Sequence, residues 1–217
     1  MKPVLFALLG MALSLPLYGE DDPVLRVDFS NPGLNPPQWT LVVHPDGSGH
    51  FHADSITKGV GDAEMIGPGT VDRDVNMSGS FATHLFETVH HHRLLRENCE
   101  SHMKVAFQGL KKISYTGPDG QGSCEFNYSK DKEIQEFGDE LVAVGSTIIE
   151  GARLEMLLQH DPLGLDKAMD YITEAANDGR LQQICTIRDT LQRLQDDPHV
   201  MDRVRKRARL LLARGDK

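Results

Sequence analysis

A five-residue turn signal, Pro-Asp-Gly-x-Gly, occurs twice in this chain, at residues 45–49 and 118–122. Proline and aspartate favour the start of a tight turn, and glycine suits positions where the backbone needs a positive φ. Each signal lies between two short segments with β-strand character. The chain is therefore expected to form two antiparallel β-hairpins, one around each turn.

The first hairpin has a clear buried face. Trp39, Leu41 and Val43 alternate with other residues before the turn, and Phe51 and Ala53 share one face after it. Side chains alternate between the two faces of a strand, so these residues predict one apolar and one polar face. The second hairpin is expected between Ile113–Thr116 and Ser123–Tyr128.

Three other segments complete the first half of the chain. Residues 20–38 are rich in proline and are expected to form an extended lead-in, and the glycine-rich residues 57–69 are expected to form a loop. Thr70–Met77 has the character of a further strand.

Helical patterns follow each hairpin. After the first, apolar or buried-type residues recur at three- and four-residue steps, which predicts one amphipathic helix. These residues are Phe81, Leu85, Val89, His92, Leu95, Cys99 and Met103. After the second hairpin, Ser129 or Asp131 can cap a longer helix that runs to about Gln159. Gly138, Gly145 and Ala152 fall seven residues apart in it, which predicts close packing against a neighbouring element.

Asp161-Pro162 should end that helix, and three shorter helical patterns follow, at residues 166–177, 181–195 and 198–213. The expected fold is α+β: an antiparallel sheet from two β-hairpins packed by two helices, with an all-α C-terminal tail. The two hairpin-plus-helix units suggest an internal duplication. The alternative is that two unrelated hairpins use the same favourable turn.

The first residues have the grammar of a secretory signal peptide. Lys2 precedes a short apolar stretch, Pro16 interrupts it, and a small residue precedes the expected cleavage between Gly19 and Glu20. An uncleaved membrane anchor is the alternative, but the stretch is shorter than the roughly 20 apolar residues that span a bilayer. The predicted organisation is a signal peptide at 1–19, an α+β domain at 20–160 and a three-helix segment at 161–217.

Charge and composition limit the classes of partner that this chain is expected to bind. The net charge of −9 disfavours binding to a phosphate backbone, so no nucleic-acid partner is expected. No second apolar run is long enough to span a membrane, so we expect no transmembrane segment in the mature chain. The basic run at residues 203–209 is interpreted as a solvated helix face beside acidic residues. Contact of this run with anionic lipid is the alternative.

The chain has three cysteines, Cys99, Cys124 and Cys185. Export to an oxidising compartment favours pairing of two of them, and a helix packed on the second hairpin would bring Cys99 to Cys124. Such a disulfide would stabilise the fold by about 3 kcal/mol in the chain-entropy treatment. The alternative is two separate buried thiols. Cys185, between isoleucines, is expected to be a buried free thiol.

Histidine is the one chemically suggestive excess. His44 is expected to face His50 across the first hairpin, and His50 and His52 share a strand face. Three imidazoles on one patch could bind zinc or copper. The alternative is the solvated face of a hairpin, since no further ligand completes the set. His90, His91 and His92 are consecutive, and on a helix they would point about 100° apart, so they are not expected to bind one ion together.

Other motifs are absent from the sequence: there is no nucleophile elbow, no phosphate-binding glycine loop, no dinucleotide fingerprint and no Cys-x-x-Cys. We therefore predict an exported, periplasmic or secreted envelope protein that is a non-enzymatic binding or inhibitor-like module without a cofactor. Its partner would be an unidentified protein of the envelope. The alternative is a metal-binding protein or metal-dependent enzyme that uses His44, His50 and His52.

Overall fold

A computed structural model describes residues 22–54 and 68–215. The predicted signal peptide, with Gly19 and Glu20 at its expected cleavage point, lies outside the described residues. So does nearly all of the glycine-rich segment 57–69.

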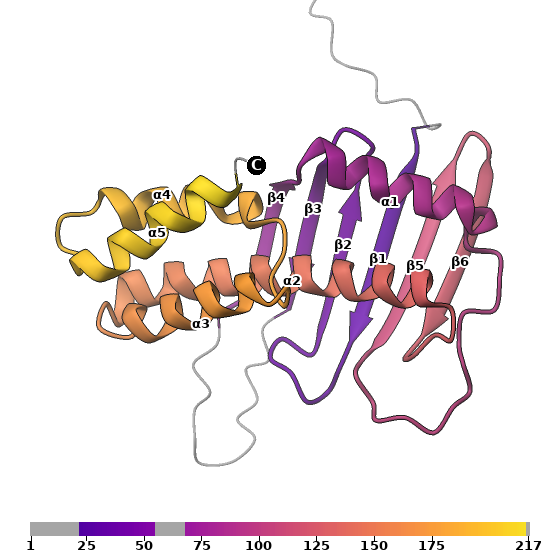
Figure 1. Ribbon diagram of the computed structural model, residues 1–217, viewed down its shortest axis with the longest axis horizontal. Helices are drawn as coiled ribbons and strands as arrows, with labels where there is room; N and C mark the ends of the chain where they lie inside the picture. Colours follow the sequence, from indigo (N-terminus) through magenta and orange to yellow (C-terminus); the bar gives the residue numbers. More distant parts are fainter. Residues whose placement is uncertain (1–21, 55–67, 216–217) are drawn as a thin grey trace, which may run out of the picture.

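The core of the molecule is one antiparallel sheet in which the strands are ordered β4-β3-β2-β1-β5-β6 (Figure 1). Its strands are β1 (Val24–Ser30), β2 (Gln38–Val43), β3 (Ser48–Ala53), β4 (Val71–Asn76), β5 (Leu110–Gly117) and β6 (Gly120–Phe126). Both predicted hairpins are confirmed, as β2–β3 and β5–β6, and so is the α+β class.

The predicted lead-in at residues 20–38 is wrong in part, because it contains a central strand of the sheet. Leu25 of β1 pairs with Val43 of β2 on one side and with Tyr115 of β5 on the other. Leu25, Val27 and Phe29 alternate in the sequence and are all buried, which is the pattern of a strand with one buried face. β1 thereby joins the two hairpins into one sheet.

The two halves of the sheet are not built alike. β1 to β4 form a continuous meander, whereas β5 and β6 form a single hairpin. β4 lies between the first hairpin and its helix, while β6 leads directly to the next helix. The hairpin-plus-helix unit therefore does not recur in the same form.

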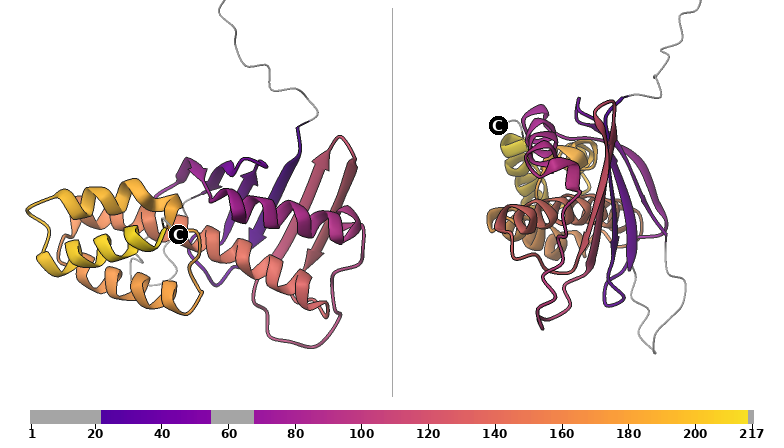
Figure 2. Two further views of the ribbon diagram at one scale, coloured as in Figure 1. Left: turned by 45° about the horizontal axis from the view of Figure 1, so that its top comes forward. Right: turned by 90° about the vertical axis from the view of Figure 1, so that its right-hand side faces the viewer.

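Two helices cover the same face of the sheet (Figures 1 and 2). They are α1 (Gly79–His91) and α2 (Lys132–His160). The predicted close packing of α2 is confirmed: a Cβ atom on Gly138 would lie 2.6 Å from Phe126, and one on Gly145 would lie 2.7 Å from Trp39. Only glycine allows α2 to approach the sheet this closely. Among the residues that the structure describes, no helix covers the other face of the sheet (Figure 2).

The first predicted helix is shorter than its periodic pattern suggests. α1 ends at His91, and the following short turn, η1 (Arg93–Leu95), has three consecutive residues with positive φ. Residues 96–109 have no regular secondary structure. Cys99 and Met103 are thus not helical, because the left-handed turn at η1 breaks the helix.

The C-terminal tail is all-α, as predicted. Its elements are α3 (Leu165–Asn177), η2 (Ile184–Ile187), α4 (Arg188–Asp196) and α5 (Asp202–Gly215). The predicted helix at 181–195 is a short 3₁₀ turn followed by α4, and α5 begins four residues after Pro198. These helices share a hydrophobic core with Leu154 and Leu157 of α2. The earlier part of α2 packs into the core of the sheet.

The basic run of α5 is largely neutralised by neighbouring carboxylates. Arg203 Nε lies 2.6 Å from Asp166 of α3, and Arg207 pairs with Asp166 and Asp170. Lys206 pairs with Asp202 at 2.8 Å. These ion pairs favour the interpretation of the basic run as a solvated helix face whose charges help to stabilise the C-terminal tail. No helix in the described part of the chain has the length and apolar character needed to cross a bilayer.

Candidate functional site

The predicted histidine patch lies on the uncovered face of the sheet, with a different register from the one expected. Val42, not His44, is opposite His50, and Thr40 is opposite His52. His44 lies one pair closer to the turn, where its backbone N–H donates to the Ser48 carbonyl at 2.8 Å. The predicted pairing of His44 with His50 is therefore wrong, because the loop is shorter than five residues. His50 and His52 do share one strand face.

Two carboxylates of the neighbouring strand β4, and one that directly follows β3, surround these two histidines. His50 Nδ1 lies 2.9 Å from Asp74 and His50 Nε2 lies 3.3 Å from Asp72. His52 Nδ1 lies 2.7 Å from Asp72 and His52 Nε2 lies 3.4 Å from Asp54. We call these five residues, Asp54, His50, His52, Asp72 and Asp74, the acid–histidine ladder. Both nitrogens of each ring already face an oxygen.

Within the ladder, His52 and Asp72 stabilise each other's charged form. The hydrogen bond to Asp72 raises the pKa of His52, and the same bond lowers the pKa of Asp72. The raised pKa of His52 favours its imidazolium form, which has no lone pair for a metal ion. In the described part of the chain, His44, His50 and His52 do not form a group with the spacing of one ion's ligands.

A shallow cavity of about 320 Å³ opens beside the ladder on the same face. Its lining includes His52, Asp54, Asp28 and Lys112. Thr40, which also lines it, donates its hydroxyl hydrogen to Asp28 at 2.8 Å. Both nitrogens of His52 face carboxylates, whereas the Thr40 hydroxyl is hydrogen-bonded to Asp28.

The two Pro-Asp-Gly-x-Gly turns are used differently. Gly47 and Gly120 have φ values of +87° and +133°, which confirms the prediction for the first glycine of each signal. The second glycines serve close approach instead: a Cβ on Gly49 would lie 2.2 Å from the Val42 carbonyl oxygen, and one on Gly122 would lie 1.8 Å from that of Leu94.

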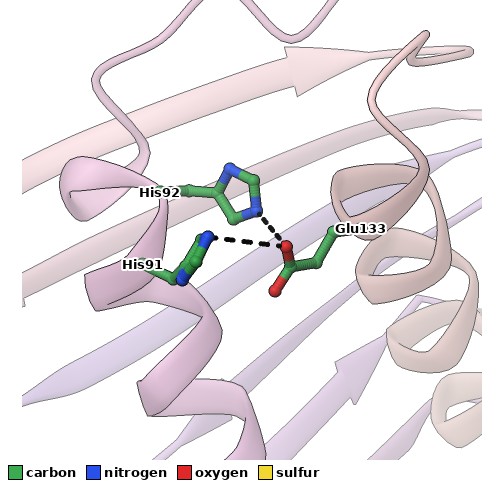
Figure 3. Close-up of side chains that lie close together, drawn as sticks. All are labelled: His91, His92 and Glu133. Atoms are coloured by element: carbon green, nitrogen blue, oxygen red, sulfur yellow. Dashed lines mark ion pairs between the residues drawn. The ribbon is translucent and has the colours of Figure 1, made fainter.

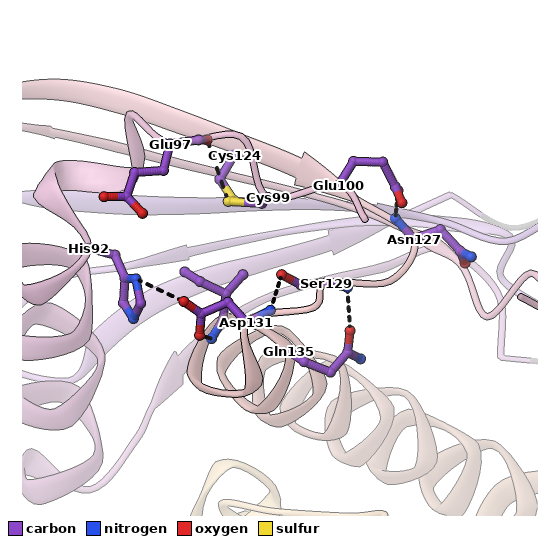
Figure 4. Close-up of a disulfide and its surroundings, with 10 residues drawn as sticks. His92, Glu97, Cys99, Glu100, Cys124, Asn127, Ser129, Asp131 and Gln135 are labelled. Atoms are coloured by element: carbon purple, nitrogen blue, oxygen red, sulfur yellow. Dashed lines mark hydrogen bonds and ion pairs between the residues drawn. A yellow bond between two sulfur atoms is a disulfide. The ribbon is translucent and has the colours of Figure 1, made fainter. Parts of the chain in front are cut away.

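Cys99 and Cys124 are joined as predicted, with Cα atoms 5.7 Å apart, and both are buried (Figure 4). Cys99 reaches this position from the irregular segment after η1 and not from a helix. Cys185 is a free thiol of intermediate burial. Burial raises the pKa of the Cys185 thiol, so the thiolate that would act as a nucleophile is disfavoured.

A second histidine cluster lies between the C-terminus of α1 and the N-terminus of α2. His91 and His92 converge on one carboxylate oxygen of Glu133, as Figure 3 shows. Glu133 Oε2 lies 3.2 Å from His92 Nε2 and 3.8 Å from His91 Nε2. Among the residues that the structure describes, these three form the one group of His, Cys or acidic side chains with ligand atoms close enough for a single metal ion.

His92 is the most distinctive member of this cluster. Its side chain is only 8% exposed, whereas that of His91 is 72% exposed and that of Glu133 is 50% exposed. Although His92 Nε2 lies within 3.2 Å of Glu133, it makes no hydrogen bond of acceptable geometry. A buried nitrogen that lacks a hydrogen bond is costly, and a metal ion on its lone pair would satisfy it.

Asp131 supports the cluster from behind. Its Oδ1 caps α2 by accepting the backbone N–H groups of Glu133 and Ile134, at 2.9 and 3.3 Å. Its Oδ2 lies 4.0 Å from His92 Nδ1 (Figure 4). This separation is too long for a hydrogen bond, but the carboxylate lies beside the ring nitrogen that an outer-shell partner commonly orients in a metal-binding histidine. The same residue thus starts the helix that carries Glu133 and faces the buried histidine.

The prediction that His90, His91 and His92 do not bind one ion together stays a prediction, but the continuous helix on which it was based is not observed. His91 is the last residue of α1, and His92 caps it with φ −90° and ψ 35°. Neighbouring rings at a helix end need not diverge by 100° per residue, and these two lie with centroids 5.3 Å apart. His90 is separate from the cluster, since its Nε2 pairs with Asp119 of the β5–β6 turn at 2.9 Å.

Asp119 also accepts a hydrogen bond from the Tyr115 hydroxyl at 2.6 Å. Burial and this bond raise the pKa of Tyr115 to about 12. The bond lowers the pKa of Asp119, so this carboxylate remains ionised opposite His90. The contact ties α1 to the second hairpin beside the candidate metal centre.

The chain matches no known protein-family model, and no curated protein shows significant sequence similarity to it.

Proposed function

We propose that this protein is an exported, non-enzymatic binding module whose ligand is a divalent transition-metal ion, held by His91, His92 and Glu133. The observation that carries the proposal is the buried Nε2 of His92, which faces Glu133 and lacks a hydrogen bond. The site replaces the predicted set of His44, His50 and His52, two of which are occupied by aspartates.

The spacing of the three ligand atoms supports a small ion. With metal–ligand bonds of 2.0–2.1 Å in a tetrahedron, ligand atoms are separated by about 3.3 Å. The Nε2–Oε2 separations of 3.2 and 3.8 Å bracket that value. Two imidazoles and a carboxylate suit Zn²⁺ best, and Cu²⁺ is a competitor. The fourth position would be taken by water or by a group from a partner.

The exported location is the second part of the proposal. It is supported by the apolar segment at 1–19 with its expected cut between Gly19 and Glu20, and by the Cys99–Cys124 pair, since disulfides persist in oxidising compartments. The periplasm and the extracellular space both fit. The exposure of His91 makes the ion accessible to an envelope protein that delivers or receives it.

Metal binding is tested by titrating Zn²⁺ into residues 20–217 against a chromophoric chelator. We expect one equivalent to bind, and His92→Ala and Glu133→Gln to weaken the affinity at least tenfold, since each loses a ligand. His84→Ala is the matched control, because His84 also lies on α1 and pairs with a glutamate of α2. Equal affinity in His92→Ala and His84→Ala, or no binding by the unmodified chain, contradicts the proposal.

Export is tested separately by expressing the full chain in a Gram-negative host and sequencing the N-terminus of the protein in the periplasm and medium. A product that starts at Glu20 is expected. A chain that retains Met1 and stays in the cytoplasm overturns this part of the proposal and leaves the metal site unaffected.

A further inference from the structure

The residues that follow His92 adopt an unusual backbone. Arg93, Leu94 and Leu95 have φ values of 51°, 60° and 61°. Residues other than glycine enter this left-handed region mainly as single residues, because the Cβ atom crowds the following carbonyl oxygen. Three in succession persist only where the surroundings fix them. The turn redirects the chain immediately after the proposed ligands.

Strand β6 supplies most of those surroundings. The Leu94 carbonyl oxygen lies so close to Gly122 that a Cβ atom there would be 1.8 Å away. Arg96 Nε donates a hydrogen bond to the Gln121 carbonyl at 2.8 Å. Leu95 is fully buried in the core of the sheet. The glycine at position 122 is thus explained by the space that the η1 turn requires.

The Cys99–Cys124 disulfide closes the same contact from its far end. Cys124 lies on β6 two residues from Gly122, and Cys99 lies four residues after the turn. His92 therefore precedes a segment, residues 93–99, that is packed on β6 at its start and covalently bonded to β6 at its end (Figure 4).

We infer that the disulfide and the packing of η1 on Gly122 position His92 for metal binding, so that the site assembles only in the oxidised protein. This inference rests on the proposed metal-binding function. In the reducing cytoplasm the thiols of Cys99 and Cys124 stay separate, residues 93–99 lack their covalent tether, and His92 is not held against Glu133. The chain then acquires its ion only after export.

The oxidation step is ordinary thiol–disulfide exchange. A disulfide oxidant of the compartment accepts two electrons and two protons and becomes two thiols, and the sulfur–sulfur bond forms between Cys99 and Cys124. Both cysteines are buried in the folded protein, so reductants have little access to the bond afterwards. The disulfide is thereby set once, at folding, and acts as an assembly requirement for the site.

The inference is tested by measuring Zn²⁺ affinity in three proteins: the unmodified chain, Cys99→Ser/Cys124→Ser, and Gly122→Ala. The affinity should fall about tenfold or more in both variants, the range typical of lost outer-shell support. Gly79→Ala is the control for Gly122→Ala, because a Cβ at Gly79 meets nothing within 4 Å. The visible spectrum of bound Co²⁺ reports the ligand set, and the loss of one imidazole from it is expected in both variants.

A variant destabilised elsewhere separates positioning from general loss of stability. Ile172→Ala removes a fully buried side chain from the C-terminal core. Matched to Cys99→Ser/Cys124→Ser in its melting temperature, it should keep the unmodified affinity and Co²⁺ spectrum. If the unmodified chain binds and all variants bind equally, the inference is overturned and the proposed function stands. If the unmodified chain does not bind, the proposed function itself fails.

Discussion

Two histidine pairs in this molecule have similar composition and opposite surroundings. His50 and His52 lie on the uncovered face of the sheet, and each ring has a carboxylate at both nitrogens. His91 and His92 lie at a helix end, converge on one oxygen of Glu133, and include a buried nitrogen without a hydrogen bond. Both pairs combine imidazoles with acids, but only the second contains a buried ring nitrogen without a hydrogen bond. His50 and His52 are half exposed, and each forms a hydrogen bond to an aspartate through Nδ1.

The comparison shows that partner geometry, more than the number of histidines, distinguishes a ligand set from an ion-pair network. The alternation of side chains on β3 and β4 places aspartates beside histidines in a regular array, so that the ring nitrogens of His50 and His52 have carboxylate neighbours. At the junction of α1 and α2, two helix ends meet and only one carboxylate oxygen serves two rings. The predictions below test this contrast.

The largest expected effect is a difference in metal affinity between the two pairs. Replacing both His91 and His92 by alanine should lower Zn²⁺ affinity roughly 100-fold or more, since two ligands are lost and even outer-shell losses reach about 100-fold. Replacing both His50 and His52 should change it less than about twofold. Competition titration measures both. A greater loss in the His50/His52 variant would reverse the comparison.

The next effect concerns the tether beside the metal centre. Without metal, Cys99→Ser/Cys124→Ser should lose about 3 kcal/mol of the free energy of unfolding, because the disulfide closes a loop of 25 residues. The measurement is urea denaturation followed by circular dichroism. The ladder has no covalent link, and a comparable loss on replacing one of its exposed residues would show that the two regions contribute alike.

A smaller effect is expected for Glu155, which binds the strand that carries Asp72 and Asp74 but does not contact the ladder itself. Arg73 of β4 donates to both oxygens of Glu155 of α2, at 3.3 and 2.9 Å, and the Thr190 hydroxyl of α4 donates to Glu155 at 2.6 Å. Burial acts to raise the pKa of Glu155, but these hydrogen bonds outweigh it and lower the pKa. Glu155→Gln should cost about 1 kcal/mol after allowance for partial solvent exposure.

This loss should appear equally in thermal melts with and without Zn²⁺. Arg73, the partner of Glu155, points to the opposite face of β4 from Asp72 and Asp74, and Glu155 lies near the C-terminal end of α2, whereas Glu133 is in its first turn. Dependence of the loss on Zn²⁺ would instead link the tail to the metal centre.

The smallest effect is the pH dependence of the ladder. The raised pKa of His52 gives stability that is present below its unfolded value of about 6.5 and is lost as the pH rises through the folded value. The lowered pKa of Asp72 gives stability that is present above about 3.8 and is lost as the pH falls through the folded value. Asp72→Asn should therefore lower the melting temperature slightly between about pH 4.5 and 6.

The difference between Asp72→Asn and the unmodified chain should shrink as the pH rises through the raised pKa of His52, because the imidazole then becomes neutral. Thermal melts at intervals of one pH unit measure it. Asp22→Asn, at an exposed position before β1, is the control. A difference that grows with rising pH would mean that the ladder does not form in solution.

Much of the fold can be predicted from local patterns in the sequence. The turn signals locate β2–β3 and β5–β6, and the spacing of Gly138 and Gly145 predicts the close packing of α2 on the sheet. Two N-cap candidates, Ser129 and Asp131, are predicted for the start of α2, and Asp131 is the one that caps it. β1 is not predicted, because the many prolines of residues 20–38 indicate an extended lead-in. Pro23 and Pro32 flank the seven-residue alternating strand, and Pro36 and Pro37 lie beyond it. Proline at the ends of a strand does not prevent pairing in its interior.

The candidate site was harder to predict, for a physical reason. The three-to-four-residue periodicity continues through Leu95 and Cys99, and both are buried, but they reach the core by way of a left-handed turn. Apolar periodicity records burial and does not record the sign of φ. A helix that stops at His91 is therefore invisible to it, and so is the convergence of His91, His92 and Glu133, which come from two elements about forty residues apart in the sequence.

The place of β1 in the sheet has a consequence for folding during synthesis. β1 is synthesised early, but it pairs with β5, which is synthesised much later; Val24, for example, pairs with Thr116. One edge of β1 therefore has no partner until β5 has been made. Long-range pairing of this kind slows folding. A nascent chain in which the middle of the sheet closes last therefore stays incompletely paired until the second hairpin has been synthesised.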